Sequence, residues 1–96
     1  MIPHQLSMFY VYVLKSMVSD KLYVGLTNDL DRRIAHHNEG RSYWTKRHAP
    51  FELVYYEAFR AVEDAKERER KLKYFKKGYY DLKKRIVHSL SKVGGG

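Results

Sequence analysis

The sequence of 96 residues has no cysteine, so it can form neither a disulfide framework nor a thiolate metal site. No apolar run approaches the roughly 20 residues that a helix needs to span a bilayer. The first seven residues lack the basic and apolar regions of a signal peptide. From these absences we expect no membrane span and a cytoplasmic location, and from the length of 96 residues we expect one domain with a modest core.

Several catalytic motifs are missing as well. The histidines at positions His36, His37 and His48 have no recognised zinc-binding spacing. No glycine-rich phosphate loop follows a predicted strand, and no Gly-x-Ser-x-Gly elbow occurs. The sequence therefore gives no support to a coenzyme-dependent or acyl-transfer enzyme, and we expect no organic cofactor.

What the sequence has in excess is positive charge. Nineteen Lys and Arg residues against eleven Asp and Glu give a net charge of +8 and a pI near 9.7. With 44% apolar and 31% charged residues, the composition is that of an ordinary globular domain. A basic domain suits a polyanionic partner, nucleic acid first and an anionic membrane surface second. Simple solubility is the alternative explanation of the charge.

Three apolar runs predict strands, at Met8–Leu14, Leu22–Thr27 and Phe51–Tyr56. The first run is continuously apolar, which predicts burial on both faces. The turn around Ser19–Asp20 is short enough for this strand to pair antiparallel with the second. Gly25, inside the second strand, has no side chain and permits close approach by a ligand or another backbone.

The segments between and after the strands predict helices. Thr27 or Asn28 can cap a first helix that ends at Gly40, with Leu30, Ile34 and His37 on one face. The rest comprises an aperiodic basic loop and two helices separated by Gly78, at Arg41–Pro50, Val62–Phe75 and Tyr79–Leu90.

The order strand, strand, helix, strand, helix, helix predicts an α+β fold, a small three-stranded antiparallel sheet flanked by helices. We expect this domain at residues 9–90, after an N-terminal extension of residues 1–8 and before a disordered tail of residues 91–96.

Glu69 lies on what should be an apolar helix face. The apolar positions of this helix recur at helical spacing, at Val62, Ala65, Leu72 and Phe75. Glu69 falls between Ala65 and Leu72, and burying an unpaired carboxylate is costly, so it needs a metal ion or an arginine. The alternative is a rim position from which the carboxylate reaches water or pairs with a nearby Lys or Arg.

Two further pairs of side chains could carry chemistry. Arg33 and His37 are four positions apart on a helix and project together. A guanidinium that can bind two phosphate oxygens would then lie beside a titratable imidazole. A solvated helix face is the alternative. Tyr12 and Tyr23 can face one another in a hairpin, but the chain has nine tyrosines and most buried tyrosines are structural.

Taken together, these residues and their spacing resemble the GIY-YIG endonuclease family. The likeness covers about residues 9–77 and rests on five segments, Val11–Val13, Tyr23–Gly25, Leu30–Asn38, Thr45–Tyr56 and Ala65–Lys73. Val11 and Val13 stand where the first signature has Gly and Ile, and Leu26 stands where one branch often has Lys. The sequence looks closest to the small stand-alone bacterial members, which are related to the nuclease domain of the DNA-repair excinuclease and to structure-specific junction nucleases.

The resemblance implies a role for each candidate residue. Glu69 would hold a single Mg²⁺ or Mn²⁺ ion, and Arg33 would contact the scissile phosphate. Tyr12, Tyr23 and His37 would position and deprotonate the attacking water, and the sequence leaves open which of them takes the proton. Basic side chains would follow the nucleic-acid backbone, namely Lys46, Arg47, His48, Lys73, Lys76 and Lys77.

The resemblance therefore predicts a metal-dependent endonuclease that hydrolyses DNA phosphodiester bonds, with RNA not excluded. Family members with defined targets usually gain specificity from an added domain, which this sequence lacks. We accordingly expect recognition of nucleic-acid structure more than sequence, or a partner protein that supplies the targeting. The alternatives are a basic nucleic-acid-binding module with weak or no cleavage, and a basic structural protein in which Glu69 and the tyrosines merely pack.

Overall fold

The computed structural model describes residues 7–40 and 43–93. For residues 43–44 it describes the backbone alone. Its strands are β1 (Phe9–Ser16), β2 (Leu22–Thr27) and β3 (Phe51–Phe59). Its helices are α1 (Leu30–Asn38), α2 (Tyr43–His48), α3 (Val62–Tyr74), α4 (Lys76–Arg85) and α5 (Val87–Ser91). The predicted α+β fold with a three-stranded antiparallel sheet is confirmed. No helix in the described ranges is long and apolar enough to cross a membrane.

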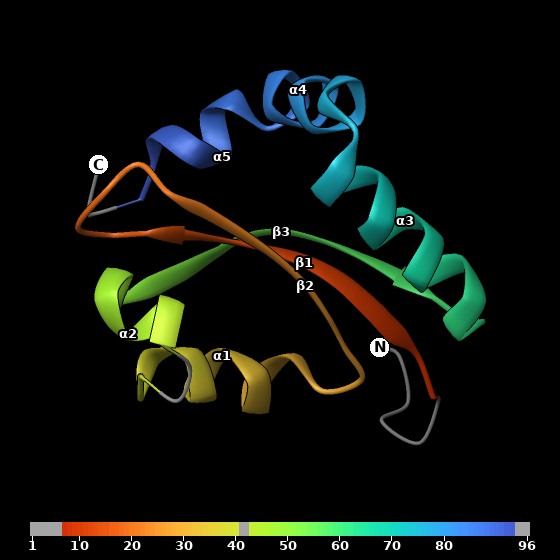
Figure 1. Ribbon diagram of the computed structural model, residues 1–96, viewed down its shortest axis with the longest axis horizontal. Helices are drawn as coiled ribbons and strands as arrows, with labels where there is room; N and C mark the ends of the chain where they lie inside the picture. The colour runs from red at the N-terminus through yellow and green to blue at the C-terminus, as the bar shows by residue number, and fades with distance from the viewer. Residues whose placement is uncertain (1–6, 41–42, 94–96) are drawn as a thin grey trace.

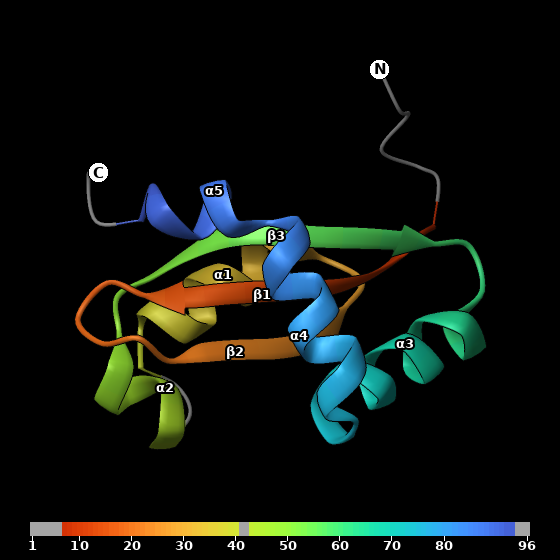
Figure 2. The ribbon, with the colours of Figure 1, turned by 90° about the horizontal axis from the view of Figure 1, so that it is seen from above.

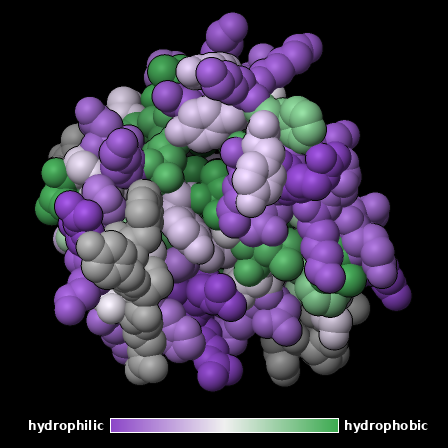
Figure 3. Space-filling model, in the orientation of Figure 1, coloured by the Kyte–Doolittle hydropathy of each residue, from purple (hydrophilic) through white to green (hydrophobic). Residues whose placement is uncertain are grey.

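The sheet has the order β2-β1-β3, with β1 in the middle and antiparallel to both neighbours. Figures 1 and 2 show α1 and α2 on one face of the sheet and α3, α4 and α5 on the other. The sheet is thus the middle of three layers. The edge formed by β2 faces the viewer in Figure 1, and hydrophobic side chains show between hydrophilic ones on this side of the molecule (Figure 3).

Strand β1 contributes to two separate hydrophobic clusters because its side chains alternate between the two faces. Val11 and Val13 pack with residues of α3 and α4, among them Leu72. Tyr12 and Leu14 pack on the opposite face, where residues of α1 cover them. All four β1 side chains are 0–1% exposed, which confirms the prediction that this run is buried on both faces.

Two local predictions before β3 were wrong. The cap of α1 is Asp29, whose carboxylate accepts the backbone N–H of Arg32 at 3.2 Å, whereas Thr27 accepts the N–H of Asp29 itself. The segment predicted as a loop contains the helix α2, which is only six residues long. Such a helix is too short to show an apolar period, and it is anchored through the fully buried Thr45.

The end of the chain also departs from the prediction. Gly78 does not separate two helices, because it lies in the first turn of α4, where a helix tolerates glycine most easily. The break comes at Phe75, which has extended backbone angles and is 50% exposed instead of packing inward. The predicted long final helix is interrupted at Ile86, and Ser91, expected in the disordered tail, ends α5. Residues 1–6 and 94–96 of the predicted extension and tail lie outside the described residues.

Candidate active site

The register of the β1–β2 hairpin places the Tyr12 phenol over Gly25. The two residues are direct partners in the antiparallel ladder, and a Cβ atom added at Gly25 would overlap the Tyr12 hydroxyl. Gly25 does permit a close approach. The group that approaches it is the Tyr12 side chain of the neighbouring strand, and not a ligand or another backbone as expected. The phenol is thereby held in a fully buried position at the centre of the sheet.

Tyr12, Tyr23 and His37 converge on one another. The Tyr12 hydroxyl lies 2.9 Å from His37 Nε2 in a buried hydrogen bond. The Tyr23 ring lies 4.5 Å from the His37 ring and 6.2 Å from the Tyr12 ring, measured between centroids. Two strands and one helix thus bring two phenols and an imidazole together, as the hairpin geometry and the helix face predicted.

Asn38 holds the end of α1 against the sheet. Its amide donates to the carbonyl of Phe51 at 3.3 Å, and its side-chain oxygen accepts the Phe51 N–H at 2.7 Å. This pair of hydrogen bonds fixes the residue next to His37 to the first residue of β3. Sequence reasoning gave Asn38 no such role, because nothing in the local pattern indicates a partner thirteen positions away.

Burial shifts the protonation of this cluster toward its neutral forms. Burial and the neighbouring Tyr23 raise the pKa of Tyr12, and the Glu69 carboxylate adds to the rise, while the charge and hydrogen bond of Arg33 oppose it. Burial, followed by the charges of Arg33 and His36, lowers the pKa of His37. At neutral pH we therefore assign a protonated Tyr12 that donates its hydrogen to the neutral His37 ring.

Arg33 links the buried cluster to solvent. Its side chain is exposed, yet it lies near enough to the Tyr12 phenol to oppose the rise in the pKa of that group. It also helps line a hollow of about 470 Å³ whose other walls are Thr27, Asn28, Asp29, Arg32 and His36. Two arginines beside a polar hollow are suited to a phosphate group, since a guanidinium can bind two oxygens at once.

Glu69 lies at the rim of the same site. Its side chain is 23% exposed, and the Lys73 ammonium lies 3.0 Å from Oε2, as the rim alternative predicted. The carboxylate is nevertheless near enough to Tyr12 for its charge to act on the phenol. The charges of Arg33 and Glu69 thus both act on the Tyr12 phenol, and the Tyr23 ring packs beside that phenol.

Glu69 is the residue that would hold a divalent cation, and such an ion would keep most of its own water. Within residues 7–40 and 45–93, no three His, Asp or Glu side chains form a cluster that could hold an ion. A bound ion would thus have fewer than three such ligands among the described residues, and Mg²⁺ accepts a site of this kind because water and substrate phosphate complete its coordination. The exposed Lys73 pair is a weak competitor for the same oxygen.

A comparison with models of protein families identifies the family of this chain. The model of the GIY-YIG catalytic domain matches residues 8–80, which is most of the chain. The chain belongs to the GIY-YIG family. Membership places it in a family of nucleases and implies a nucleic-acid substrate. It also agrees with the resemblance seen in the sequence.

Relatives of similar size support this membership. A UPF0213 protein of Clostridium perfringens is 39% identical over 85 residues, which cover 88% of this chain and 87% of the relative. A UPF0213 protein of Bacillus pumilus is 38% identical over 76% of this chain and 74% of its own length. A UPF0213 protein of Staphylococcus haemolyticus is 40% identical over 69% of this chain and 80% of its own length. No solved structure matches the chain significantly.

The six basic residues proposed for nucleic-acid contact fall in two places on this GIY-YIG domain. Lys46 and Arg47 are exposed on α2, whereas Lys73, Lys76 and Lys77 are exposed at the end of α3 and the start of α4, on the other side of the sheet. The remaining one is His48.

His48 is half-buried and tied to the β1–β2 turn. Its carbonyl accepts the Ser16 hydroxyl at 2.6 Å, and its Nδ1 lies 3.3 Å from Ser19 Oγ. These contacts give His48 a structural role in joining α2 to the sheet, whatever contact it makes with nucleic acid.

The glycine of the second GIY-YIG signature provides a first prediction. Replacing Gly25 with alanine is expected to lower the free energy of unfolding by about 1–3 kcal/mol, because the new methyl group must displace the buried Tyr12 phenol. Urea denaturation measures the change, and the Tyr12–His37 hydrogen bond should be lost with it.

Gly78 supplies the matched control. An added Cβ there would lie 3.6 Å from the nearest backbone oxygen, an ordinary contact, and the residue is helical. Gly78→Ala is therefore expected to stabilise the protein by no more than about 0.5 kcal/mol, because glycine costs less in the first turn of a helix than in its middle. Equal stability of the two variants would contradict the packing described for Tyr12.

Proposed function

We propose that this protein is a divalent-metal-dependent endonuclease that hydrolyses DNA phosphodiester bonds and recognises nucleic-acid structure more than sequence. The observation that carries the proposal is the buried Tyr12–His37 hydrogen bond, on whose phenol the opposite charges of Arg33 and Glu69 both act. Burying polar groups is costly. A purely structural protein would gain little from burying an imidazole between two phenols within the influence of an arginine and a carboxylate.

The three rings would divide the handling of the attacking water. Tyr12 is fully buried and its pKa is raised, so we assign it a positioning role, holding the His37 ring through Nε2. Tyr23 is only half-buried, so it is the ring that a water molecule reaches. It would orient the water and take part in its deprotonation beside the neutral imidazole, whose Nε2 already accepts the Tyr12 hydroxyl.

Arg33 and Glu69 would act on the phosphate. The Arg33 guanidinium faces the polar hollow and would stabilise the negative charge that builds up on the phosphoryl oxygens during attack. Glu69 would hold the divalent cation, which supplies positive charge near the leaving oxygen. Both side chains then act on the same phosphate from different elements, α1 and α3.

The charge of the chain supports a substrate recognised through its backbone. A net charge of +8 favours phosphate contacts, which fix position and affinity without reading bases. The exposed Lys46 and Arg47 on α2, with the lysines of α3 and α4, would supply such contacts. Binding would then be salt-sensitive, and recognition would depend on the shape of the DNA.

The test is cleavage of labelled duplex, nicked, flapped and branched DNA with and without Mg²⁺ or Mn²⁺. We expect cutting of at least one substrate with the metal and none after EDTA is added, while binding persists because the lysines and arginines do not need the ion. Readdition of the metal should restore cutting. Cutting that EDTA does not affect would contradict the proposed use of a divalent cation.

A second candidate function is favoured by the ion pair between Glu69 and Lys73, in which the carboxylate already has a cation at 3.0 Å. If that pair persists on DNA, the protein is a basic binding module with weak or no cleavage. Salt-dependent binding without cutting of any substrate, with either metal, would favour this alternative.

A further inference from the structure

The corner between α3 and α4 exposes two aromatic side chains among lysines. Tyr74 is 76% exposed and Phe75 is 50% exposed, and both are flanked in the sequence by the exposed Lys73, Lys76 and Lys77. Figure 2 shows this connection reaching outward beyond the β2 edge of the sheet. Both rings are therefore outside the core and available to a ligand.

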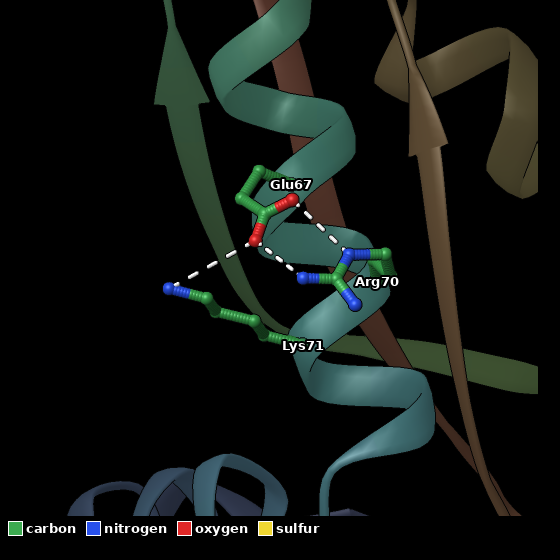
Figure 4. Close-up of polar contacts among 3 residues, drawn as sticks. All are labelled: Glu67, Arg70 and Lys71. Atoms are coloured by element: carbon green, nitrogen blue, oxygen red, sulfur yellow. Dashed lines mark hydrogen bonds and ion pairs between the residues drawn. The ribbon is translucent and has the colours of Figure 1, made fainter.

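The Phe75 ring is braced by the helix it follows. The extended backbone at Phe75 separates the two helices, and its N–H still bonds to the carbonyl of Lys71 at 3.2 Å. The Arg70 guanidinium lies 5.1 Å from the centre of the ring. Arg70 is itself held by Glu67 through contacts of 2.6 Å and 3.1 Å (Figure 4). Arg70 thus lies over one face of the ring, and a planar ligand would stack on the other.

A hollow of about 500 Å³ lies beside these rings. Its walls are Leu22, Val24, Leu72, Lys73, Tyr74, Phe75, Lys76 and Tyr79. Of the described residues that line it, two are lysines, three are aromatic and none is acidic. Aromatic walls suit the flat face of a base, and the lysines suit the phosphates on either side of it.

The hollow adjoins the proposed active site. Lys73 forms part of its wall, and the same Lys73 ammonium lies 3.0 Å from Glu69 Oε2. One turn of α3 thus separates the hollow from the carboxylate proposed to hold the metal. A nucleotide bound in the hollow would lie close to the phosphodiester bond that is cut.

We propose that the α3–α4 corner stacks an unpaired base of the substrate, with Tyr74 and Phe75 as the stacking side chains, so that the substrate is DNA with unpaired nucleotides next to the cleavage point. This inference rests on the proposed nucleic-acid function. A base inside a regular duplex is already stacked on its neighbours and does not offer its face. Flapped, branched or single-stranded DNA does offer it, and an aromatic platform with lysines selects for such DNA.

The test is binding of a flapped DNA that carries 2-aminopurine in the flap, measured in EDTA so that cleavage plays no part. Stacking should quench the fluorescence of the wild-type complex. Tyr74→Ala combined with Phe75→Ala is expected to weaken flap binding by about 5- to 150-fold and to abolish the quenching. Binding of a fully paired duplex should change by less than about threefold.

Two further variants separate stacking from other effects. Phe75→Trp should preserve flap binding and quenching, whereas Phe75→Leu, which keeps an apolar side chain, should not. The control is Tyr80→Ala, since Tyr80 is 54% exposed on α4 but is not part of this hollow. Full binding by the Leu variant would overturn base stacking in favour of apolar docking of a protein, and equal losses on duplex and flap would also overturn it.

This experiment can fail independently of the proposed enzyme. If the wild-type protein cuts DNA but the corner variants bind the flap as tightly as it does, the stacking proposal is wrong and the nuclease proposal stands. If flap binding depends on the corner but no DNA is cut, stacking stands and the nuclease proposal fails.

Discussion

Replacing Glu69 with glutamine is expected to reduce DNA cleavage by more than about 100-fold while the protein still folds and binds. Glutamine has nearly the same shape but no charge, so it cannot hold a divalent cation in the way a carboxylate does. Loss of a supporting residue around a metal already costs about 10- to 100-fold, and loss of the single protein ligand should cost more. Little stability should be lost, because Glu69 is partly exposed and its Lys73 pair is weak.

The measurement is single-turnover cleavage at saturating protein, with DNA binding followed in EDTA. Glu63→Gln is the matched control, since it makes the same chemical change at an exposed position of the same helix. It should cleave within about threefold of wild type. If Glu69→Gln cleaves as fast as Glu63→Gln, the carboxylate does not hold the metal and the rim interpretation of Glu69 is sufficient.

The parts of the site that could be predicted from the sequence depend on short-range geometry. The spacing of Arg33 and His37 on a helix fixes their common direction, whatever the rest of the fold does. The position of Glu69 between Ala65 and Leu72 follows from the same period, and the structure does bury both flanking residues. Such predictions hold because a helix imposes them locally.

The parts that could not be predicted depend on contacts between distant segments. The hydrogen bonds between Asn38 and Phe51 join a helix end to a strand start, and no local pattern encodes that meeting. The position of the Tyr12 phenol over Gly25 requires the strand register, which a sequence without a tight-turn signature leaves open.

Phe75 shows how a correct period can mislead. It falls at helical spacing after Leu72, so pattern reasoning places it in the core. The helix ends one residue earlier, at Tyr74, and the ring turns outward. Phe75 is also part of the proposed stacking surface. Functional positions are often those at which the local sequence preference and the observed structure disagree.

Replacing Arg33 with alanine is expected to lower the single-turnover rate constant by about 100- to 1,000-fold, the usual cost of removing a group that stabilises transition-state charge. Arg33→Lys should recover only part of this loss, because lysine keeps the charge but not the two-pronged geometry. Arg32→Ala is the control, since Arg32 lines the same hollow. It should weaken DNA binding modestly and leave the rate at saturation within about threefold.

The protonation of His37 gives a readout that does not depend on cleavage. The charge of Arg33 helps to lower the pKa of His37, so its removal should raise that pKa toward the ordinary value near 6.5. As the pH falls, the imidazole would then become protonated at a higher pH than in the wild type. The pH below which any residual activity declines should therefore rise. An NMR titration of the His37 ring should show the upward shift in Arg33→Ala and not in Arg32→Ala. An unchanged His37 titration in Arg33→Ala would contradict the placement of Arg33 beside the buried cluster, and an unchanged rate would remove it from the chemistry.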